Sequence, residues 1–356
     1  MTQGSEPSLS LTAVAPGAVR RPFTDRGPLS DAVQRHLVDA STGTDHTELA
    51  RRVVAESPDV IRDEDIHLAL FALYASAYGS IGAFSPSHEW DPQLIATRMV
   101  LESAFESALR RAITMPDLPS PDQDAVSRAL FALTKPQPGP SLSRHLAKKA
   151  TAEQAREFFV QRSVYTLREA DPHSWAIPRL HGRAKAALVE IQADEYGGGR
   201  ADDMHSALFA VAMRGMGLDD SYGGFVDHVP ALTLASHNMM SMFGLNRRLV
   251  GAIVGHLTAF EMTSSIPSRL YADGLRRLGY GAEVTDYFDV HVEADAVHEQ
   301  IAGRDLAGAL AEDRPELLED IMFGAAACLA VDGWVEQHIM EAWSRGQSSL
   351  RAGTVL

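Results

Sequence analysis

The sequence contains almost no cysteine: Cys328 is the only one among 356 residues. A single thiol excludes an internal disulfide and fits a reducing compartment. It also argues against iron–sulfur clusters and thiolate zinc sites, which need several cysteines. A metal site in this chain would therefore have to use histidine and carboxylate ligands.

The sequence also lacks an apolar run of the roughly 20 residues that a membrane-spanning helix needs. Residues 1–29 are rich in Ser, Pro, Gly and Thr, and they lack the cationic start and apolar core of a secretory signal. We expect residues 1–29 to form a disordered, mobile tail, and we expect the protein to be cytoplasmic.

Basic residues are in the minority, with 32 Lys and Arg against 47 Asp and Glu, and the net charge is −15. Because nucleic-acid binding needs a basic surface that neutralises phosphates, this balance argues against a nucleic-acid partner. The content of hydrophobic residues is 45%, which is typical of a globular protein. These values leave a small-molecule substrate open.

The alternation of apolar and polar residues that marks half-buried strands is missing, and helical periodicity dominates. A proline-rich stretch at 136–140 predicts a linker. We therefore expect an all-α protein whose helices pack as a bundle. The predicted helices span 63–83, 90–113, 152–169, 178–196, 201–216, 245–262, 269–278, 285–303 and about 315–343.

One predicted helix presents three potential metal ligands on the same side. His291, Asp295 and His298 occupy positions i, i+4 and i+7, which lie within about 60° of one another around a helix. Two imidazoles and a carboxylate suit a metal such as iron. If this side faces the interior, it predicts a metal site; if it faces solvent, it is an acidic surface.

Further candidate ligands occur in other helices. Glu261 ends an otherwise apolar segment, where an unpaired buried carboxylate would be costly; the alternative is a surface glutamate near the helix end. Glu195 and His205 flank the three glycines at 197–199, which would allow the chain to bend and bring both toward one centre. The alternative is an ordinary helix end and a polar helix face. Glu169 ends another predicted helix, where a solvated charge cluster is the alternative.

Taken together, the candidates are four carboxylates and three imidazoles. Helical bundles that bind two irons use such a mixture, drawn from facing helices. A haem site would need only an axial histidine and would leave the carboxylates unexplained. The seven residues are Glu169, Glu195, His205, Glu261, His291, Asp295 and His298.

The strings around these residues resemble the haem-oxygenase-like diiron oxidases and oxygenases, often described as the iron-containing redox enzyme family. The resemblance covers about residues 150–350 and extends to the metal-binding helical domain of an N-oxygenating member of that family. The matching strings are EADPHSWAIPRL at 169–180, EIQADEYGGGR at 190–200, Met204-His205, GHLTAFEMTSS at 255–265 and HVEADAVH at 291–298.

This resemblance implies a haem-oxygenase-like helical bundle that binds iron and not haem. It implies that all seven candidates are iron ligands, with Glu190 as the alternative to Glu169. It also implies that the second iron is weakly held and that the helix carrying His291 is partly unwound until metal binds. The implied domains are the tail, an additional N-terminal helical region at 30–135 that contributes to a dimer, and the diiron domain at 141–350.

The activity that the resemblance implies is that of a non-haem diiron oxygenase, which uses two Fe(II)/Fe(III) ions and O2 as co-substrate. Among such reactions we expect N-oxygenation of an amino-acid-derived amine or guanidine in a biosynthetic pathway. One alternative is a diiron oxidase that desaturates an aliphatic acid or amino acid, or cleaves one of its C–C bonds. Others are a mononuclear or dimanganese variant, and a non-enzymatic helical binding protein with vestigial metal ligands.

The expected partners are a small-molecule substrate, an external electron donor and a second copy of the chain in a homodimer. An amino-acid substrate would need its carboxylate held, most naturally by an arginine. Arg269 is the candidate for this contact, with Arg247 and Arg248 as alternatives. For each of them the competing interpretation is an ordinary surface arginine. We expect no catalytic residue beyond the metal ligands.

Overall fold

The computed structural model describes residues 21–38, 43–136 and 139–354, except for the side chains of residues 293–296. Within these ranges the backbone forms helices and turns and contains no strand, so the all-α prediction is confirmed. The predicted linker at 136–140 lies partly outside the described residues, and residues 1–20 of the expected tail lie wholly outside them.

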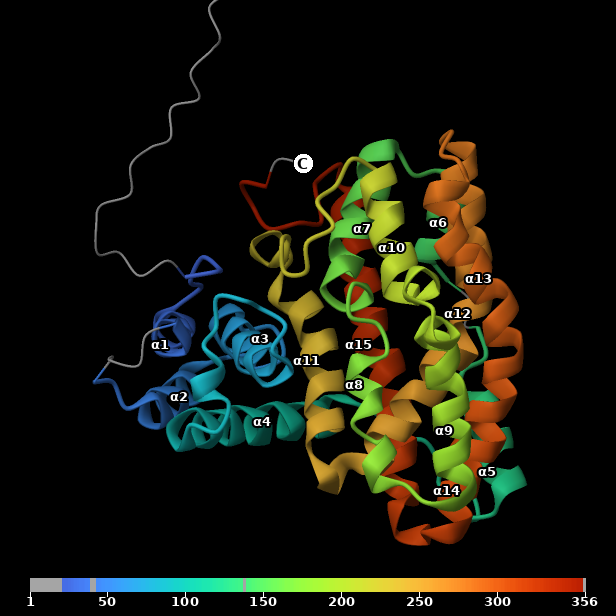
Figure 1. The fold of residues 1–356 in the computed structure, drawn as a ribbon, viewed down its shortest axis with the longest axis horizontal. Helices are drawn as coiled ribbons and strands as arrows, with labels where there is room; N and C mark the ends of the chain where they lie inside the picture. Colours follow the sequence, from blue (N-terminus) through green and yellow to red (C-terminus); the bar gives the residue numbers. More distant parts are fainter. Residues whose placement is uncertain (1–20, 39–42, 137–138, 355–356) are drawn as a thin grey trace, which may run out of the picture.

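The N-terminal helices form a layer beside the main bundle, at the left of Figure 1. This layer consists of α1 (Pro28–Val38), α2 (His46–Glu56), α3 (Glu64–Tyr78), the 3₁₀ turn η1 (Pro86–His88) and α4 (Pro92–Ala112). Every residue of α3 from Asp65 to Ala75 is buried. This helix packs on α1 and α4 and also on α11 (Ala231–Leu245) of the bundle, so it joins the layer to the rest of the protein.

The bundle is built from long helices that run in roughly the same direction in Figure 1. They are α7 (Ala152–Thr166), α9 (Gly182–Glu195), α10 (His205–Gly215), α11, α12 (Val250–Arg277), α13 (Ala282–Gln300) and α15 (Leu318–Ser344). The shorter helices are α5 (Gln123–Leu133), α6 (Leu142–Lys148), α8 (Asp171–Ser174), α14 (Ala309–Asp313) and the π-helix η7 (Ile301–Gly308). The 3₁₀ turns are η2 (Ile177–Arg179), η3 (Gly197–Gly199), η4 (Ala201–Asp203), η5 (Val226–His228), η6 (Arg247–Leu249) and η8 (Pro315–Leu317).

Local sequence explains where several helices begin. Asp63 accepts a hydrogen bond from the backbone N–H of Ile66 at the start of α3, and Asp91 caps α4 in the same way. Thr151 and Gln154 form a reciprocal capping box at the start of α7. Such side chains satisfy the N–H groups that the first turn of a helix leaves unpaired.

The core of the bundle is organised around α12, which packs on α6, α13, α15 and η7. Together with η6 it spans Arg247–Arg277 and is long and apolar enough to cross a membrane. However, 67% of its most apolar window is buried inside the protein. That burial is typical of the central helix of a folded core.

The predicted break between residues 262 and 269 is wrong, because α12 continues through Pro267. A proline removes one intrahelical hydrogen bond and usually bends or ends a helix. Here both halves of the helix are held by neighbours. The first half lies against α15, and the second lies against α6, where Arg277 donates to the carbonyls of Leu146 and Ala150.

Residues 21–29, which we expected in the mobile tail, are folded against the protein. Phe23 is 5% exposed. The Arg26 guanidinium contacts Glu64 and donates to the backbone carbonyls of Val226 and Val229. The prediction from composition is wrong for this segment, because Phe23 and Arg26 contact residues that are distant in the sequence.

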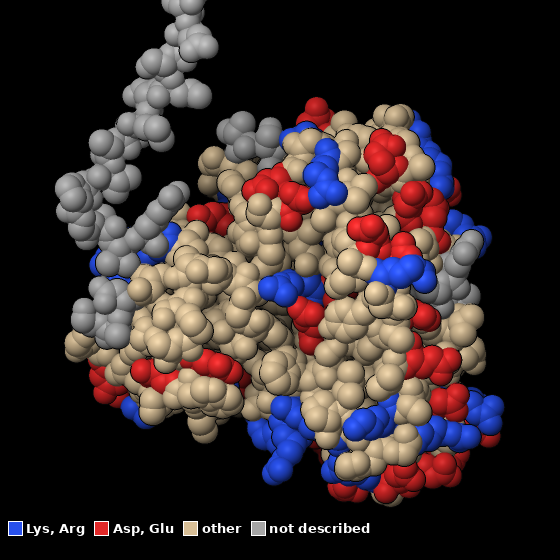
Figure 2. All heavy atoms as spheres, viewed as in Figure 1, with Lys and Arg blue, Asp and Glu red and all other residues tan. Residues whose placement is uncertain are grey.

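Charged side chains of both signs are interspersed on the face shown in Figure 2, and the Lys and Arg residues there do not join into one basic surface. The lack of a continuous basic surface on this face agrees with the net charge of −15.

Gly255 on α12 and Gly324 on α15 allow these two helices to approach closely. A Cβ at Gly324 would overlap the carbonyl of Ala252, whereas a Cβ at Gly333 on the same helix would meet nothing within 4 Å. We predict that Gly324→Ala lowers the free energy of unfolding by about 1–3 kcal/mol, because the overlap forces the helices apart. Gly333→Ala is the matched control and should raise it by about 0.5–1 kcal/mol. Urea denaturation followed by circular dichroism measures both, and equal effects would show that the contact does not constrain the core.

Candidate metal centre

Five elements bring six of the seven predicted ligands into the interior. Glu169 follows α7, Glu195 is the last residue of α9 and His205 is the first residue of α10. Glu261 lies on α12, and two histidines lie on α13. None of the six is more than 7% exposed: Glu169, Glu195, His205, Glu261, His291 and His298.

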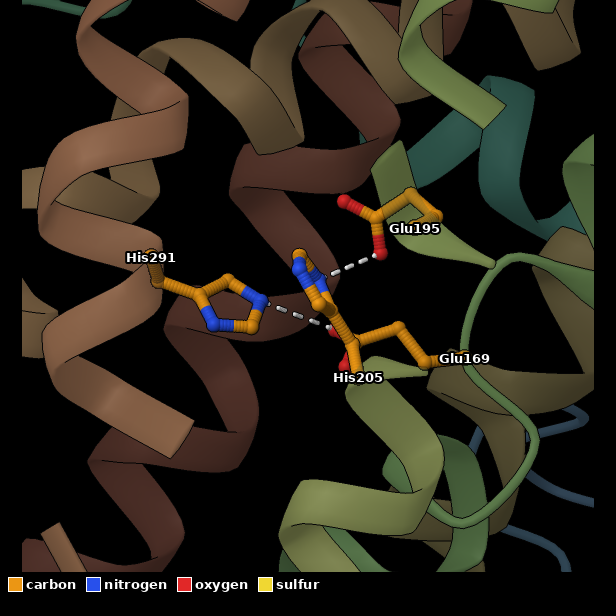
Figure 3. A group of neighbouring side chains, drawn as sticks. All are labelled: Glu169, Glu195, His205 and His291. Carbon is orange, nitrogen blue, oxygen red and sulfur yellow. Dashed lines mark ion pairs between the residues drawn. The ribbon is translucent and has the colours of Figure 1, made fainter. Parts of the chain in front are cut away.

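Four of these side chains form one group, shown in Figure 3. Glu195 Oε2 lies 2.9 Å from His205 Nδ1, and Glu169 Oε1 lies 3.7 Å from His291 Nε2. The ring centroids of His205 and His291 are 4.3 Å apart. Each residue offers one ligand atom, and the four ligand atoms lie within 4.8 Å of one another. This is the clustering that the side chains need to surround one cation.

A second group consists of Glu195, Glu261 and His298, whose ligand atoms also lie within 4.8 Å of one another. Glu261 Oε2 lies 3.3 Å from His298 Nδ1. Because Glu195 belongs to both groups, the two candidate sites are neighbours that share one carboxylate.

The turn between α9 and α10 explains how Glu195 and His205 meet. The three glycines of η3 all have positive φ angles. A Cβ at Gly197 would lie 2.6 Å from the backbone of Asp203 and Met204. Only glycine therefore allows the chain to fold back this tightly, and the turn places the end of one helix beside the start of the next.

Glu169 is held by a second unusual turn. Ala170 has a φ of 75° and is the one non-glycine residue with positive φ among those described. Its carbonyl accepts a hydrogen bond from Gln192 Nε2 at 2.9 Å. Left-handed backbone at an alanine is strained and persists only where the surroundings impose it. The strain falls directly beside a proposed ligand.

Hydrogen bonds fix the orientation of two ligands in the first group. The Tyr287 hydroxyl donates to Glu169, at 3.0 Å from Oε1 and 2.8 Å from Oε2. The Tyr287 carbonyl lies 2.6 Å from His291 Nδ1. Because a carbonyl only accepts, Nδ1 carries the proton, and the lone pair on Nε2 points toward Glu169. Metal-binding histidines are typically held in this way.

His298 in the second group is held by Asp194, whose Oδ2 lies 3.0 Å from Nε2. Burial lowers the pKa of His298, but the Glu261 and Asp194 carboxylates outweigh burial and raise the pKa to about 9. The surroundings of this imidazole therefore favour positive charge, whether that charge is a proton or a metal ion.

The charges of the carboxylates also fit a cation. Burial raises the pKa of Glu261, and the neighbouring Glu195 adds to the rise, while His298 partly offsets it. Burial also raises the pKa of Glu169, but His291, His205 and the Tyr287 hydroxyl together outweigh it and leave the pKa lowered. Concentrating buried carboxylates is costly without compensating positive charge.

His205 provides a further test of fit. Its Nδ1 is buried and lies close to Glu195, yet the two atoms are not aligned for a hydrogen bond. Two ligands that point toward a common ion show this arrangement, since both lone pairs face the ion and not each other. The donor set of carboxylates and imidazoles suits iron, so the residues present fit the metal that the sequence predicted.

The remaining predicted site residues lie elsewhere. The side chain of Asp295 lies outside the described residues. Glu190, the alternative to Glu169, is exposed on α9, and Arg269 and Arg247 are exposed as well. Arg248 pairs with Glu106. None of these arginines lines the pocket at the centre, which contrasts with the expected contact to a substrate carboxylate.

Sequence reasoning missed Tyr287, Asp194 and Gln192, which hold the proposed ligands in place. A signal existed for two of them. Tyr287 lies one helical turn before His291, and Asp194 directly precedes Glu195 at a helix end. The connection of Gln192 to Ala170 depends on a turn that the sequence did not predict.

Comparison with known proteins gives the family of this chain. A family model described as iron-containing redox enzyme matches residues 156–333, which is half of the chain and includes all the proposed ligands. The chain belongs to the iron-containing redox enzyme family. It is therefore an oxidoreductase with the haem-oxygenase-like helical fold, and the resemblance stated from the sequence is confirmed.

One curated relative is nitrosourea synthase from Streptomyces achromogenes subsp. streptozoticus. The two sequences are 30% identical over 159 residues, which are 44% of this chain and 34% of the relative. The chain thus matches about a third of the length of that protein. The likeness covers part of a longer enzyme and does not extend to its whole architecture.

We predict that Asp194→Ala weakens metal binding at the group containing His298 by about 10- to 100-fold, because His298 loses the carboxylate that orients it. Glu190→Ala is the matched control, since Glu190 lies on the same helix but is exposed. Anaerobic titration with Fe(II) against a competing chelator measures the affinity. Equal affinities in the two variants would show that Asp194 does not support the site.

Proposed function

We propose that this protein is a non-haem diiron oxygenase that activates O2 at the two buried ligand groups. The observation that carries the proposal is the sharing of Glu195 between the groups. A shared carboxylate would allow this chain to hold two cations as neighbours, and helical bundles that bind two irons use such carboxylate ligands.

We assign Glu169, Glu195, His205 and His291 to one iron, and Glu195, Glu261 and His298 to the other. Asp295 is the seventh ligand in this proposal, because it lies on α13 between the two histidines in sequence. When bound, the two irons would supply the electrons that reduce O2.

The protein's own contribution is to position the ligands and to limit access of water. Tyr287 holds Glu169 through both carboxylate oxygens, and Asp194 holds His298. Tyr165 and Phe260 line the pocket, and their ring centroids lie 5.5 Å apart. Ligands that are fixed and buried are what oxygen chemistry requires if reactive species are not to be lost to solvent.

Within the proposal we prefer N-oxygenation of an amino-acid-derived amine or guanidine. The name of the curated relative supports this choice, because a nitrosourea carries an oxidised nitrogen.

The interpretation as a binding protein with vestigial ligands has less support. It would require Glu261 and His291 to face apart, whereas both line the same pocket. The proposal also includes an external electron donor, a cytoplasmic location and a homodimer. It assigns iron, and not manganese, to both ligand groups.

The proposal predicts the iron content of matched variants. Reconstituted anaerobically with Fe(II), the wild-type protein should bind two irons per chain and consume O2 when a substrate amine is supplied. His298→Ala and His205→Ala should each lose about one iron and most of the O2 uptake, because each removes an imidazole from a different group. His181→Ala is the control, since His181 is exposed. Iron analysis and an oxygen electrode provide the measurements.

Full iron content and O2 uptake in both ligand variants would contradict the assignment. A wild-type protein that binds no iron under these conditions would overturn the proposed function itself.

A further inference from the structure

A separate cluster of potential metal ligands lies in the N-terminal layer, on the side of Figure 1 opposite to α13. It consists of His36, His88 and Asp91, each of which offers one ligand atom, and the three atoms lie within 4.8 Å of one another. The His36 side chain is buried, whereas His88 and Asp91 are half-buried. None of the three is a proposed iron ligand, so the cluster needs its own explanation.

Three short segments bring these side chains together. His36 lies in the last turn of α1, His88 ends the 3₁₀ turn η1, and Asp91 directly precedes α4. The N–H of Asp91 donates to the His88 carbonyl at 3.1 Å, which closes the turn that carries both side chains. The N–H of Ser85 donates to the carbonyl of Leu37 at 2.9 Å, which joins this turn to the end of α1. Main-chain hydrogen bonds therefore hold the cluster in place.

The two carboxylate oxygens of Asp91 have separate roles. Oδ1 accepts hydrogen bonds from the backbone N–H groups of Gln93 and Leu94 and so caps α4. Oδ2 lies 3.3 Å from His36 Nε2. Two ligand atoms bound to one tetrahedral zinc ion lie about 3.3 Å apart, because each lies about 2.0–2.1 Å from the metal. The separation of these two atoms thus agrees with a shared zinc ion.

His46 contacts the other ring nitrogen of His36. It is fully buried, and its Nε2 lies 2.8 Å from His36 Nδ1. A hydrogen bond from His36 Nδ1–H to this atom leaves the lone pair of His36 Nε2 on the side of Asp91. Histidines that bind metals typically make such a hydrogen bond through the nitrogen that does not bind the metal. The alternative is the opposite tautomer, in which Nε2–H donates to Asp91 and the cluster is a chain of hydrogen bonds.

His88 favours the metal site over the hydrogen-bond chain. Its ring meets the His36 ring edge to face, at 87° and with the centroids 5.1 Å apart. A chain from Asp91 through His36 to His46 needs no further imidazole beside it, whereas a metal ion needs a third ligand. Two imidazoles and one carboxylate form the ligand set of zinc sites that keep a fourth position open for water. The partial exposure of His88 and Asp91 allows water to reach that position.

We infer that His36, His88 and Asp91 bind one Zn²⁺, with His46 as the positioning residue that orients the His36 ring. The ion ties the end of α1 to the start of α4 and gives the N-terminal layer a metal site of its own. This inference does not depend on the proposed function, because no residue is common to the two sites.

Counting zinc in matched variants tests the site. The full-length protein is loaded anaerobically with Fe(II) and dialysed against buffered Zn²⁺, and both metals are counted per chain. His88→Ala should hold one zinc fewer than the wild type and the same amount of iron. Glu89→Gln is the matched control, since Glu89 is exposed beside the cluster, and it should hold as much zinc as the wild type. Zinc taken up by the proposed iron ligands is common to all samples, so the difference reports this cluster alone.

Asp91→Asn separates the loss of a ligand from the loss of the fold. Asparagine still caps a helix through its side-chain oxygen, but it presents an amide nitrogen in place of Oδ2. Zinc binding should weaken about 10-fold or more, since the loss of a ligand costs at least as much as the loss of its support. Circular dichroism checks that the variant keeps the helix content of the wild type. Unchanged zinc affinity in a folded Asp91→Asn variant would contradict the inference.

The position of the ion provides a measurement that needs no variant. In crystals grown with Zn²⁺, an anomalous peak at the zinc edge should lie between His36 Nε2, His88 and Asp91 Oδ2. Zinc peaks at the proposed iron ligands alone, or equal zinc content in the wild type and His88→Ala, would overturn the inference and leave a chain of hydrogen bonds. The iron content of the same samples tests the proposed function separately.

Discussion

The concentration of three buried glutamates in one small volume is the constraint on which the rest of the structure depends. Glu169, Glu195 and Glu261 come from three different parts of the chain and line one pocket. Their desolvation and mutual repulsion must be offset by positive charge and hydrogen bonds. Histidines on α10 and α13 and the Tyr287 hydroxyl supply these contacts. The histidines among these groups are also the proposed metal ligands, so the same side chains contribute to the stability of this region and to the proposed site.

Two backbone turns and one close helix contact determine where the three glutamates lie. The glycine turn at 197–199 sets Glu195 beside His205, and the strained turn at Ala170 positions Glu169. Gln192 connects the second turn to the pocket, since its amide nitrogen holds the Ala170 carbonyl. The glycine contacts between α12 and α15 hold the helix that bears Glu261 against the rest of the core. Each of these features lies outside the ligand set, yet each determines where a ligand stands.

Much of the helical fold could be predicted, and the failures have identifiable reasons. Helices with N-terminal side-chain caps, such as α3, α4 and α7, begin within two residues of the predicted start. The break predicted before Arg269 fails because packing on both sides of Pro267 outweighs the lost hydrogen bond. α11 was missed because it has no side-chain cap to mark its start and is buried on nearly every side. The folded segment at 21–29 depends on contacts with residues some 200 positions away.

The sequence by itself determined the fold class and the chemical type of the site. In a chain with one cysteine, helical periodicity and seven well-spaced carboxylates and imidazoles, any metal site is restricted to nitrogen and oxygen ligands within a helical bundle. Only the tertiary structure decided that Glu195 belongs to two groups, that Glu169 is buried while Glu190 is exposed, and that Tyr287 and Asp194 hold their neighbours. These facts depend on the angles at two turns and on the separation of packed helices. Spacing along one helix carries no information about either, because contacts between helices are set by the packing of the whole core.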